Sequence, residues 1–505
     1  MKLKNFRSYL RNDRERYMVF NSIEFIVFLI IVLPIYFLIN KKYKSIVLLV
    51  SSYYFYMAWK PEYIILIIIS TIFNYFIAKL IDKNKDISIK KVYLLICIIF
   101  NLTLLFVFKY LNFMIESVNE IIHIFDSKYS INTVNLLLPM GISFFTFQAL
   151  GYVIDVYKNE IEPENNLIKF SLYITFFPQL VAGPIEKASR LIPQFYEEHK
   201  FEYQNVVSGL KRMILGFFKK IVIADRLAVA VDTIYNNPQS YSGLPLILAT
   251  FAFGVQIYCD FSGYSDIAIG VSKIMGFDIM ENFKRPYFSK NISEFWHRWH
   301  ISLSSWFREY VYIPLGGSRV KRSRIYFNIL ITFLISGLWH GASWTFVIWG
   351  ALHGIYLILS RVLKPFRERI SDIIKLNKYP RLQSTIRVIT TNLLVMFAWI
   401  FFRANNLKDA IYIVNNLFVN LNDVFNIRYI LNSLSNMGLS NIEVISAILS
   451  IIILIIISFI QRDKSISKLI STQKLIVRYF IYSGIIMYMI IFSYVGNSQF
   501  IYFQF

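Results

Sequence analysis

The sequence predicts an all-α protein that crosses a membrane many times, and three observations support this fold class. The 505-residue chain is 56% hydrophobic and 17% aromatic, which is more apolar surface than a soluble protein can cover with polar groups. Its apolar runs approach the roughly 20 residues of a bilayer-spanning helix, as in 23–39, 63–78, 92–108, 445–460 and 475–492. Lys and Arg cluster in the short gaps between the runs. We therefore expect about ten to twelve crossings.

The basic gaps also predict how the spans are oriented. Lys41, Lys42 and Lys44 follow the first apolar run, whereas the gaps at 60–62 and 116–133 are poor in Lys and Arg. Basic gaps tend to lie in the cytoplasm. The gap at 462–474 is basic as well. From Met18 onward, both ends of the chain are therefore expected outside the cell.

The first 17 residues disagree with this orientation. Segment 1–17 carries six Lys or Arg, which would favour a cytoplasmic N-terminus. Either translation begins at Met18 and 1–17 lies upstream of the protein, or 1–17 is an exported basic tail. We expect residues 18–505 to form a single transmembrane domain.

The formal net charge of +22 does not indicate nucleic acid. The basic residues lie in short clusters between apolar runs rather than along one amphipathic face, so nucleic-acid binding is not expected. Cys97 and Cys259 both lie inside apolar runs, without the spacing of a disulfide framework or a metal motif. We interpret both as core residues.

Two stretches are too basic to be ordinary spans. Residues 205–235 place Lys and Arg among Leu, Ile, Phe and Val, a pattern typical of a helix that lies at the cytoplasmic interface. Residues 277–324 hold nine Lys or Arg together with aromatic residues and two histidines. We expect 277–324 to form a structured cytoplasmic mouth, followed by an apolar segment over 325–360.

His340 interrupts an almost wholly apolar stretch that begins at Ile325. At 1.5 Å per residue, a straight helix would place this histidine roughly 22 Å into the span. Ionisable groups at such depth are costly and are usually functional. Gly337 and Gly341 would let another backbone or a ligand approach closely, and Trp339 with Trp344 would wall a cavity. A neutral imidazole in this setting is suited to take a proton from a hydroxyl that attacks an acyl thioester.

The other histidines allow plainer interpretations. A buried structural histidine is the alternative for His340 and the preferred interpretation of His353. His297 and His300 are three residues apart and would share one helical face. Without a third ligand at a matching spacing, His-x-x-His is a weak metal pattern, and no metal is expected. The alternative for this pair is capping or hydrogen bonding within a Trp-rich elbow that includes Trp299.

Asp260 and Asp266 lie six residues apart in an apolar stretch. Unpaired carboxylates there would be costly, so we expect ion pairs. Arg285, Arg298 and Arg308 are the candidate partners, in a framework that supports the mouth rather than catalysis. Since nothing in the sequence resembles a nucleophile elbow, we expect direct transfer rather than an acyl-enzyme.

Several motifs resemble those of the membrane-bound O-acyltransferase family, and within it the alginate O-acetyltransferase branch. They are "LLPMGISFFTFQALGYVIDVY", "FFPQLVAGPIEKASRLIPQF", "GFFKKIVIADRLA", "QIYCDFSGYSDIAIG", "FWHRWHISLSSWFREYVYIPLGG", "GLWHGASWTFVIWGALHG" and the closing "FIYFQF". The resemblance covers 18–505. It implies a ring of transmembrane helices, with re-entrant and interfacial helices, around a central tunnel. It also places the family's principal catalytic histidine on His340 and its second motif histidine on His300.

The resemblance further implies a function. The protein would move an acetyl group from acetyl-CoA or another cytoplasmic acyl thioester, with no tightly bound cofactor, for O-acetylation of an envelope or secreted polysaccharide. It would lie in the bacterial cell membrane and work with an extracytoplasmic partner of the serine-hydrolase type. Two alternatives stay open: a D-alanyl transfer protein for teichoic acids, which is generally shorter, and a polysaccharide transporter or flippase. The sequence does not identify the polysaccharide.

Overall fold

The computed structural model describes residues 18–505 except 126–128, 182, 421, 423–424, 463–465, 495, 497–499 and 502–505. The described residues form helices and connecting loops, with no strand among them. The expectations for segment 1–17 lie outside these residues.

Seven helical stretches of the described chain are long and apolar enough to cross a membrane. They are Pro61–Lys83, Ile87–Phe125, Leu244–Ile274, Trp344–Val362, Pro380–Arg403, Asn441–Ile460 and Leu475–Phe492. Two further apolar helices, α2 (Ile23–Leu38) and α7 (Ile142–Tyr157), have 16 residues each. The predicted all-α polytopic membrane fold is confirmed. The expected ten to twelve crossings stay a prediction.

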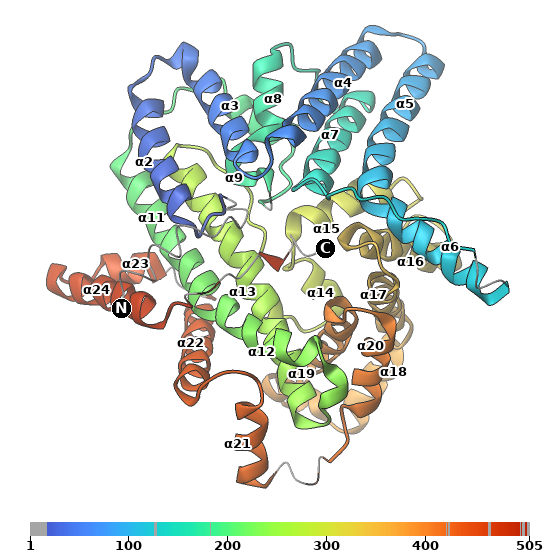
Figure 1. The fold of residues 1–505 in the computed structure, drawn as a ribbon, viewed down its shortest axis with the longest axis vertical. Coiled ribbons are helices and arrows are strands. Elements are labelled where there is room, and N and C mark those ends of the chain that lie inside the picture. Colours follow the sequence, from blue (N-terminus) through green and yellow to red (C-terminus); the bar gives the residue numbers. More distant parts are fainter. Residues whose placement is uncertain are drawn as a thin grey trace.

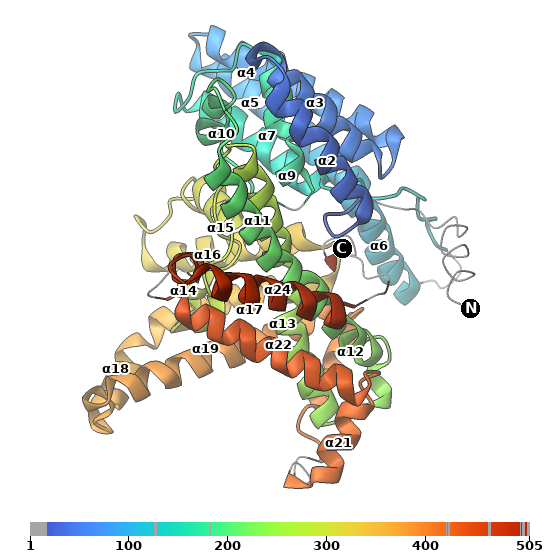
Figure 2. The ribbon, with the colours of Figure 1, turned by 90° about the vertical axis from the view of Figure 1, so that its left-hand side faces the viewer.

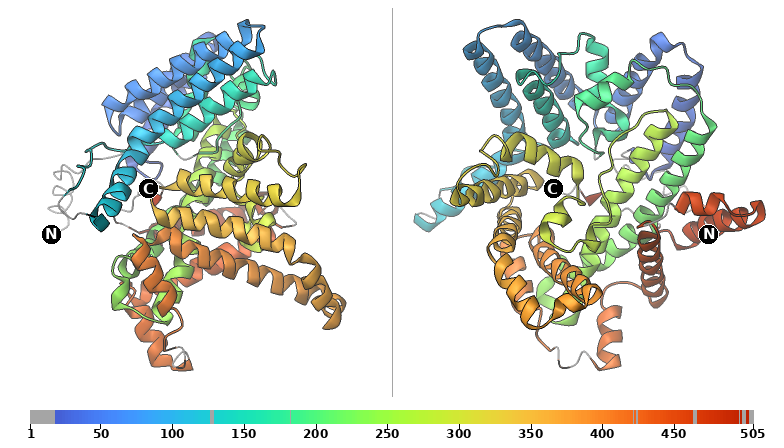
Figure 3. Two further views of the ribbon diagram at one scale, coloured as in Figure 1. Left: turned by 90° about the vertical axis from the view of Figure 1, so that its right-hand side faces the viewer. Right: turned by 180° about the vertical axis from the view of Figure 1, so that it is seen from behind.

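The N-terminal third forms one group of helices (Figure 1). Its members besides α2 and α7 are α3 (Lys41–Met57), η1 (Pro61–Tyr63), α4 (Ile64–Lys83), α5 (Ile87–Leu105), α8 (Leu167–Thr175), α9 (Phe177–Leu180) and α10 (Ala188–Gln194). A single π-helical turn, η2 (Phe106–Tyr110), joins α5 to α6 (Leu111–Phe125). Helix α6 then extends away from the body (Figures 1 and 3).

The 31-residue helix α13 (Leu244–Ile274) runs beside a helix built from three parts. These parts are α11 (Tyr203–Phe217), the π-helical turn η3 (Phe218–Ala224) and α12 (Asp225–Tyr235). Two glycine pairs bring the backbones together. A Cβ on Gly209 would lie 2.5 Å from the Gly270 carbonyl oxygen, and one on Gly216 would lie 2.6 Å from that of Gly263. The two helices are therefore antiparallel and in direct backbone contact, as small residues permit in membranes.

This packing corrects the prediction of an interfacial helix over 205–235. Lys219, Lys220 and Arg226 are buried rather than presented on an outer basic face. The reason is that η3 turns both lysines toward the carboxylates of α13, where charge pairing is stronger than in water.

The segment 277–343 contains short helices followed by one long one. The short elements are η5 (Pro286–Phe288), α14 (Ile292–Trp296), α15 (Ile301–Phe307) and η6 (Arg308–Tyr312). Helices α14 and α15 lie near the middle of the view in Figure 1. The long helix α16 (Arg322–His340) pairs with α17 (Trp344–Val362), and the pair is close because Gly337 faces Gly350.

The remaining helices form the other side of the molecule (Figure 2). They are η4 (Pro238–Ser240), α18 (Lys364–Ile373), η7 (Leu376–Lys378), α19 (Pro380–Arg403), α20 (Leu407–Asn416), α21 (Ile427–Ser435), α22 (Asn441–Ile460), α23 (Ile466–Ser471) and α24 (Leu475–Phe492). Helices α18 and α21 extend away from the body (Figures 2 and 3). The chain then returns to the interior, where Phe500 and Ile501 are buried and the Ile501 N–H donates to Asp260 Oδ2 at 2.7 Å.

Candidate active site

His340 is the last residue of α16 and is only 4% exposed. Among the described residues, aromatic rings pack against its imidazole with centroid distances of 4.9 Å to Trp339, 4.9 Å to Trp349 and 5.3 Å to Phe402. Because these rings come from α16, α17 and α19, the packing of three helices fixes the position of this histidine.

The structure decides two expectations about the surroundings of His340. Gly337 and Gly341 do not leave room for a ligand, because a side chain on either would collide with Phe346 of α17. Of the two expected uses, the structure bears out the close approach of another backbone, that of α17. Trp344 does not wall the site either, since it is 51% exposed and packs on Phe113.

His300 lies at the start of α15 in a left-handed conformation, with φ 43°, and is fully buried. Its Nδ1 lies 3.2 Å from Asn282 Oδ1. An amide oxygen can only accept, so this bond requires the proton on Nδ1 and leaves Nε2 as the basic nitrogen. The same Asn282 oxygen also accepts from the Ser302 N–H at 3.2 Å and from its hydroxyl at 3.0 Å.

His300 and His340 lie against the same indole. The Trp339 ring centroid is 6.1 Å from that of His300 and 4.9 Å from that of His340. Phe261 of α13 packs edge-on against the His300 ring at 4.6 Å. The fold thus brings together two histidines that are forty positions apart in the sequence.

The other two histidines differ from these. His297 is exposed, and its Nδ1 bonds the Ser293 carbonyl oxygen at 2.6 Å. The prediction that His297 and His300 share a helical face is wrong, because α14 ends at Trp296 and His300 begins a new helix. His353 is buried, and its Nδ1 accepts from Trp296 Nε1 at 3.3 Å, which fits a structural role.

The two aspartates form buried ion pairs, but not with the expected arginines. Lys220 Nζ lies 2.6 Å from Asp260 and 2.7 Å from Asp225. Lys219 and Arg212 each lie 2.6 Å from Asp266. The ion-pair framework therefore exists, with cations from α11 and η3 in place of Arg285, Arg298 and Arg308.

The sequence pattern did not identify these partners because 205–235 was interpreted as an interfacial helix, whereas it packs along α13. Arg298 instead pairs with Glu294 one turn earlier at 2.5 Å, and Arg308 is exposed. Trp299 is buried and packs on Phe283 and Trp399, each at 5.1 Å, so it supports the short helices.

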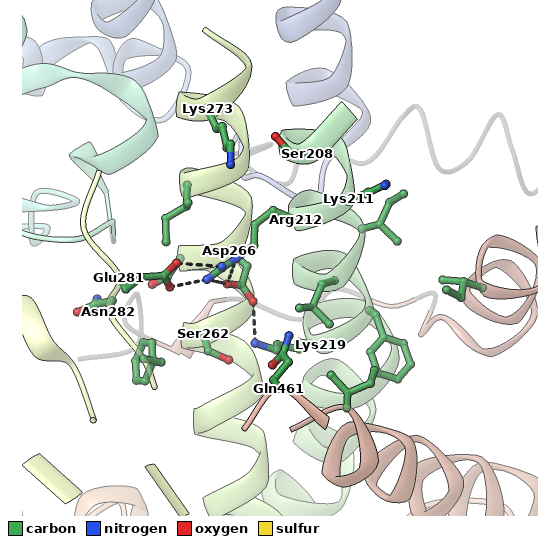
Figure 4. Close-up of a pocket in the computed structure, with 18 of the residues that line it drawn as sticks. Ser208, Lys211, Arg212, Lys219, Ser262, Asp266, Lys273, Glu281, Asn282 and Gln461 are labelled. Atoms are coloured by element: carbon green, nitrogen blue, oxygen red, sulfur yellow. Dashed lines mark hydrogen bonds and ion pairs between the residues drawn. The ribbon is translucent and has the colours of Figure 1, made fainter. Parts of the chain in front are cut away.

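A pocket of about 1560 Å³ lies between α11, α13, the segment 276–285 and the helices α22 and α24. Eight basic side chains line it, compared with three acidic ones. The basic residues are Arg190, Lys211, Arg212, Lys219, Lys273, Lys284, Arg285 and Arg462, and the acidic ones are Asp266, Asp278 and Glu281. Figure 4 shows Arg212 between Asp266 and Glu281, with Asn282 at the edge of the same group. Because Asn282 lines the pocket and also bonds His300, the pocket adjoins the buried histidines.

Only part of the predicted mouth lines this pocket. Of the range 277–324, residues 277–279 and 281–285 contribute, whereas Arg298 and Arg308 do not. The segment 277–285 is held by Glu186, which is 2% exposed and accepts a hydrogen bond from the Met280 N–H. Burial raises the pKa of the Glu186 carboxyl to about 7.

Lys109 also belongs to the site, although it is not among the residues predicted from the sequence. It lies in η2, and its ammonium donates to the Trp339 carbonyl oxygen at 2.6 Å and to that of His340 at 3.1 Å. The signal was present in the sequence. Lys109 directly follows the apolar run 92–108 and precedes further apolar residues, where a lysine is as unusual as His340 is in its own segment.

The fold and the site define a polytopic helical membrane protein whose buried histidine pair adjoins a large basic pocket. Residues 163–402 match the model of the membrane-bound O-acyltransferase family. The chain is 40% identical over 398 residues to "Probable alginate O-acetylase AlgI" of Pseudomonas aeruginosa, covering 78% of this chain and 73% of that protein. It belongs to the membrane-bound O-acyltransferase family and is an O-acyltransferase.

Two further relatives differ from each other in the acyl group that their names describe, which is acetyl in one and D-alanyl in the other. A "Peptidoglycan O-acetyltransferase" of Helicobacter pylori is 36% identical over 411 residues, covering 76% of this chain and 75% of that protein. A "Teichoic acid D-alanyltransferase" of Bacillus subtilis is 31% identical over 234 residues, covering 44% of this chain and 59% of that protein.

Proposed function

We propose that this protein moves an acetyl group from a cytoplasmic acyl thioester, with acetyl-CoA as the first candidate, for O-acetylation of an envelope or secreted polysaccharide. The observation that carries the proposal is the basic pocket that reaches His300 through Asn282. A donor that carries phosphates suits a pocket with eight basic side chains, because Lys and Arg bind phosphate oxygens strongly.

The two histidines have different roles in this proposal. His340 takes the proton of the acceptor hydroxyl as its oxygen attacks the thioester carbonyl carbon. The new C–O bond forms, the C–S bond breaks, and the proton passes to the leaving thiolate. His300, whose Nδ1 is held by Asn282, positions the donor on the pocket side. General-base assistance of this kind typically contributes about 10²- to 10⁴-fold in rate.

The resemblance supports acetyl transfer over D-alanyl transfer. The alginate and peptidoglycan relatives match about three quarters of the chain, whereas the teichoic acid relative matches 44%. Hydrolysing each purified envelope polymer from strains with and without the gene distinguishes the two, because acetate or D-alanine is released. Loss of neither ester would favour the transporter alternative.

We further propose that the protein lies in the bacterial cell membrane and that an extracytoplasmic protein of the serine-hydrolase type completes the transfer. The gaps expected outside the cell are short, and acyl transfer needs the acceptor oxygen held within about 3–3.5 Å of the carbonyl carbon. A second chain would supply that grip on the polymer and could accept the acetyl group at the outer end of a central tunnel.

Reconstitution tests both proposals. The purified protein is placed in liposomes with labelled acetyl-CoA inside and purified glycan outside, and His340→Ala serves as the inactive control. Label on the glycan only when the partner is added supports the full proposal. Efficient labelling without any second protein would refute the partner while leaving acyl transfer intact.

A further inference from the structure

We propose that Lys109 is a positioning residue for acyl transfer, which holds the end of α16 and thereby the imidazole of His340. This inference rests on the proposed role of His340 as the base. Lys109 itself lies outside the pocket proposed for the donor.

The turn that carries Lys109 is a single π-helical insertion between two α-helices. Its residues, Phe106–Tyr110, lie where α5 passes the end of α16. Such insertions are rare and occur frequently at functional sites. A π-turn holds one more residue than an α-turn, so it changes which side chains face the neighbouring helix. Here it directs both Lys109 and Tyr110 to α16.

Three consecutive carbonyls at the end of α16 accept hydrogen bonds from this turn. Lys109 Nζ donates to the Trp339 oxygen at 2.6 Å and to the His340 oxygen at 3.1 Å, and the Tyr110 hydroxyl donates to the Leu338 oxygen at 2.9 Å. The last four carbonyls of a helix have no partner within the helix. The Gly341 N–H bonds the Gly337 carbonyl oxygen, and the turn caps the three carbonyls that follow it.

The positive charge of the Lys109 ammonium suits its position at the C-terminus of α16. A helix C-terminus carries a partial negative charge that favours a cation. Within the part of the chain that the structure describes, no carboxylate forms an ion pair with Lys109, and its neighbours are the two carbonyls and the Trp339 ring at 5.9 Å. The charge of Lys109 is thus directed at the backbone of the two residues that carry the indole and the imidazole.

Since His340 is the final residue of α16, the position of its ring depends on the last helical turn staying closed. Loss of the cap would let this turn open and shift the imidazole. A displacement of about 1 Å can cost about 10²-fold in rate. The effect should fall on kcat for acetyl-CoA rather than on KM, because neither Lys109 nor His340 lines the basic pocket.

The test compares three substitutions at 109 with a matched neighbour. Lys109→Met removes both charge and donors, Lys109→Gln keeps a donor, and Lys109→Arg keeps both. Tyr110→Phe removes only the bond to the Leu338 carbonyl and serves as the control for docking of the two helices. Turnover of acetyl-CoA by purified protein gives kcat and KM, and ester content of the polymer in complemented deletion strains gives transfer whatever the donor is.

We expect Lys109→Met to lower kcat about 10²-fold with KM within twofold, Lys109→Arg to recover at least a tenth of the activity, and Tyr110→Phe to lose less than threefold. A Lys109→Met variant within threefold of the native kcat overturns the proposal. Equal losses for Lys109→Met and Tyr110→Phe, with equal loss of thermal stability, also overturn it and leave a structural role. If the Met variant does not fold, the Gln variant decides by the same limits.

The proposed function can fail separately. If His340→Ala retains activity, His340 is not the general base. If purified protein does not turn over acetyl-CoA while the ester content in cells is normal, only the assignment of acetyl-CoA as the donor is wrong.

Discussion

Asn282 accepts a hydrogen bond from His300 at 3.2 Å, and both side chains are completely buried. Asn282 lies in the segment that lines the basic pocket, whereas His300 contacts the indole shared with His340. This contact links the pocket to the buried histidines through polar side chains, and it fixes the tautomer of His300.

Asn282→Ala should lower transfer about 10-fold or more, because the His300 ring would lose the partner that sets its tautomer and orientation. The assay is polymer ester content in a complemented deletion strain, at matched membrane levels of protein. Ser302→Ala, which removes only the hydroxyl that donates to Asn282 Oδ1, is the control and should lose much less. Native activity in Asn282→Ala would show that the bond between Asn282 and His300 does not contribute to acyl transfer.

His340→Ala should abolish O-acetylation while the protein inserts at its normal level. Removing a general base typically costs about 10²- to 10⁴-fold. His353→Ala is a useful comparison, because that imidazole is equally buried and should affect stability more than turnover. If purified His340→Ala keeps more than half of the native rate, His340 is structural.

Lys220→Met should destabilise the protein strongly. Lys220 is buried between Asp260 and Asp225, and breaking a buried pair from one side typically costs about 3–5 kcal/mol. The unfolding midpoint in detergent measures this effect, and Lys211→Met, a half-buried neighbour without an ion pair in the described structure, should change it little. Equal midpoints for the two variants would show that the buried pair contributes nothing.

The stability of the protein should fall as pH rises from about 4.5 to about 7, through Glu186. Its carboxyl has an ordinary pKa of 4.5, which burial raises to about 7 in the folded protein. The folded state therefore holds a proton that the unfolded chain releases, so this contribution is complete below pH 4.5 and lost above 7. A shift of this size corresponds to about 3 kcal/mol.

Glu186→Gln provides the check on that pH dependence. The amide keeps an acceptor for the Met280 N–H and does not titrate. The difference in unfolding midpoint between pH 5 and pH 8 should shrink in this variant, and an unchanged difference would assign the titration to another group.

Cysteine labelling tests the predicted orientation, in which both ends of the chain from Met18 onward face outside. In a variant without Cys97 and Cys259, a cysteine placed at position 43 should stay unlabelled by an impermeant reagent in intact cells. Labelling at position 43 would contradict the predicted orientation.

The sequence predicted the fold class well because a bilayer imposes long apolar runs that composition alone reveals. It also singled out His340, since a histidine within an apolar segment is conspicuous, whereas His300 lies in a basic segment and was singled out by the family resemblance. The family resemblance added their roles, which remain predictions.

The ion-pair partners of Asp260 and Asp266 were missed because their signals depend on tertiary contact. Lys219 and Lys220 suggested a surface helix until η3 placed them against α13. One available signal was the glycine spacing, since Gly209 and Gly216 are seven apart and so are Gly263 and Gly270. A match of this kind predicts two helices in backbone contact, and it would have brought the lysines to the aspartates.

The bond from Ile501 to Asp260 also has a consequence for when the protein is complete. The two residues are separated by 241 positions. Because a chain is synthesised from its N-terminus and its earlier parts begin to fold first, α13 and η3 can join before residue 501 exists. Asp260 then has Lys220 but not yet its backbone donor. The interior around Asp260 is therefore completed only after residue 501 has been synthesised and has packed against α13, which was synthesised 241 positions earlier.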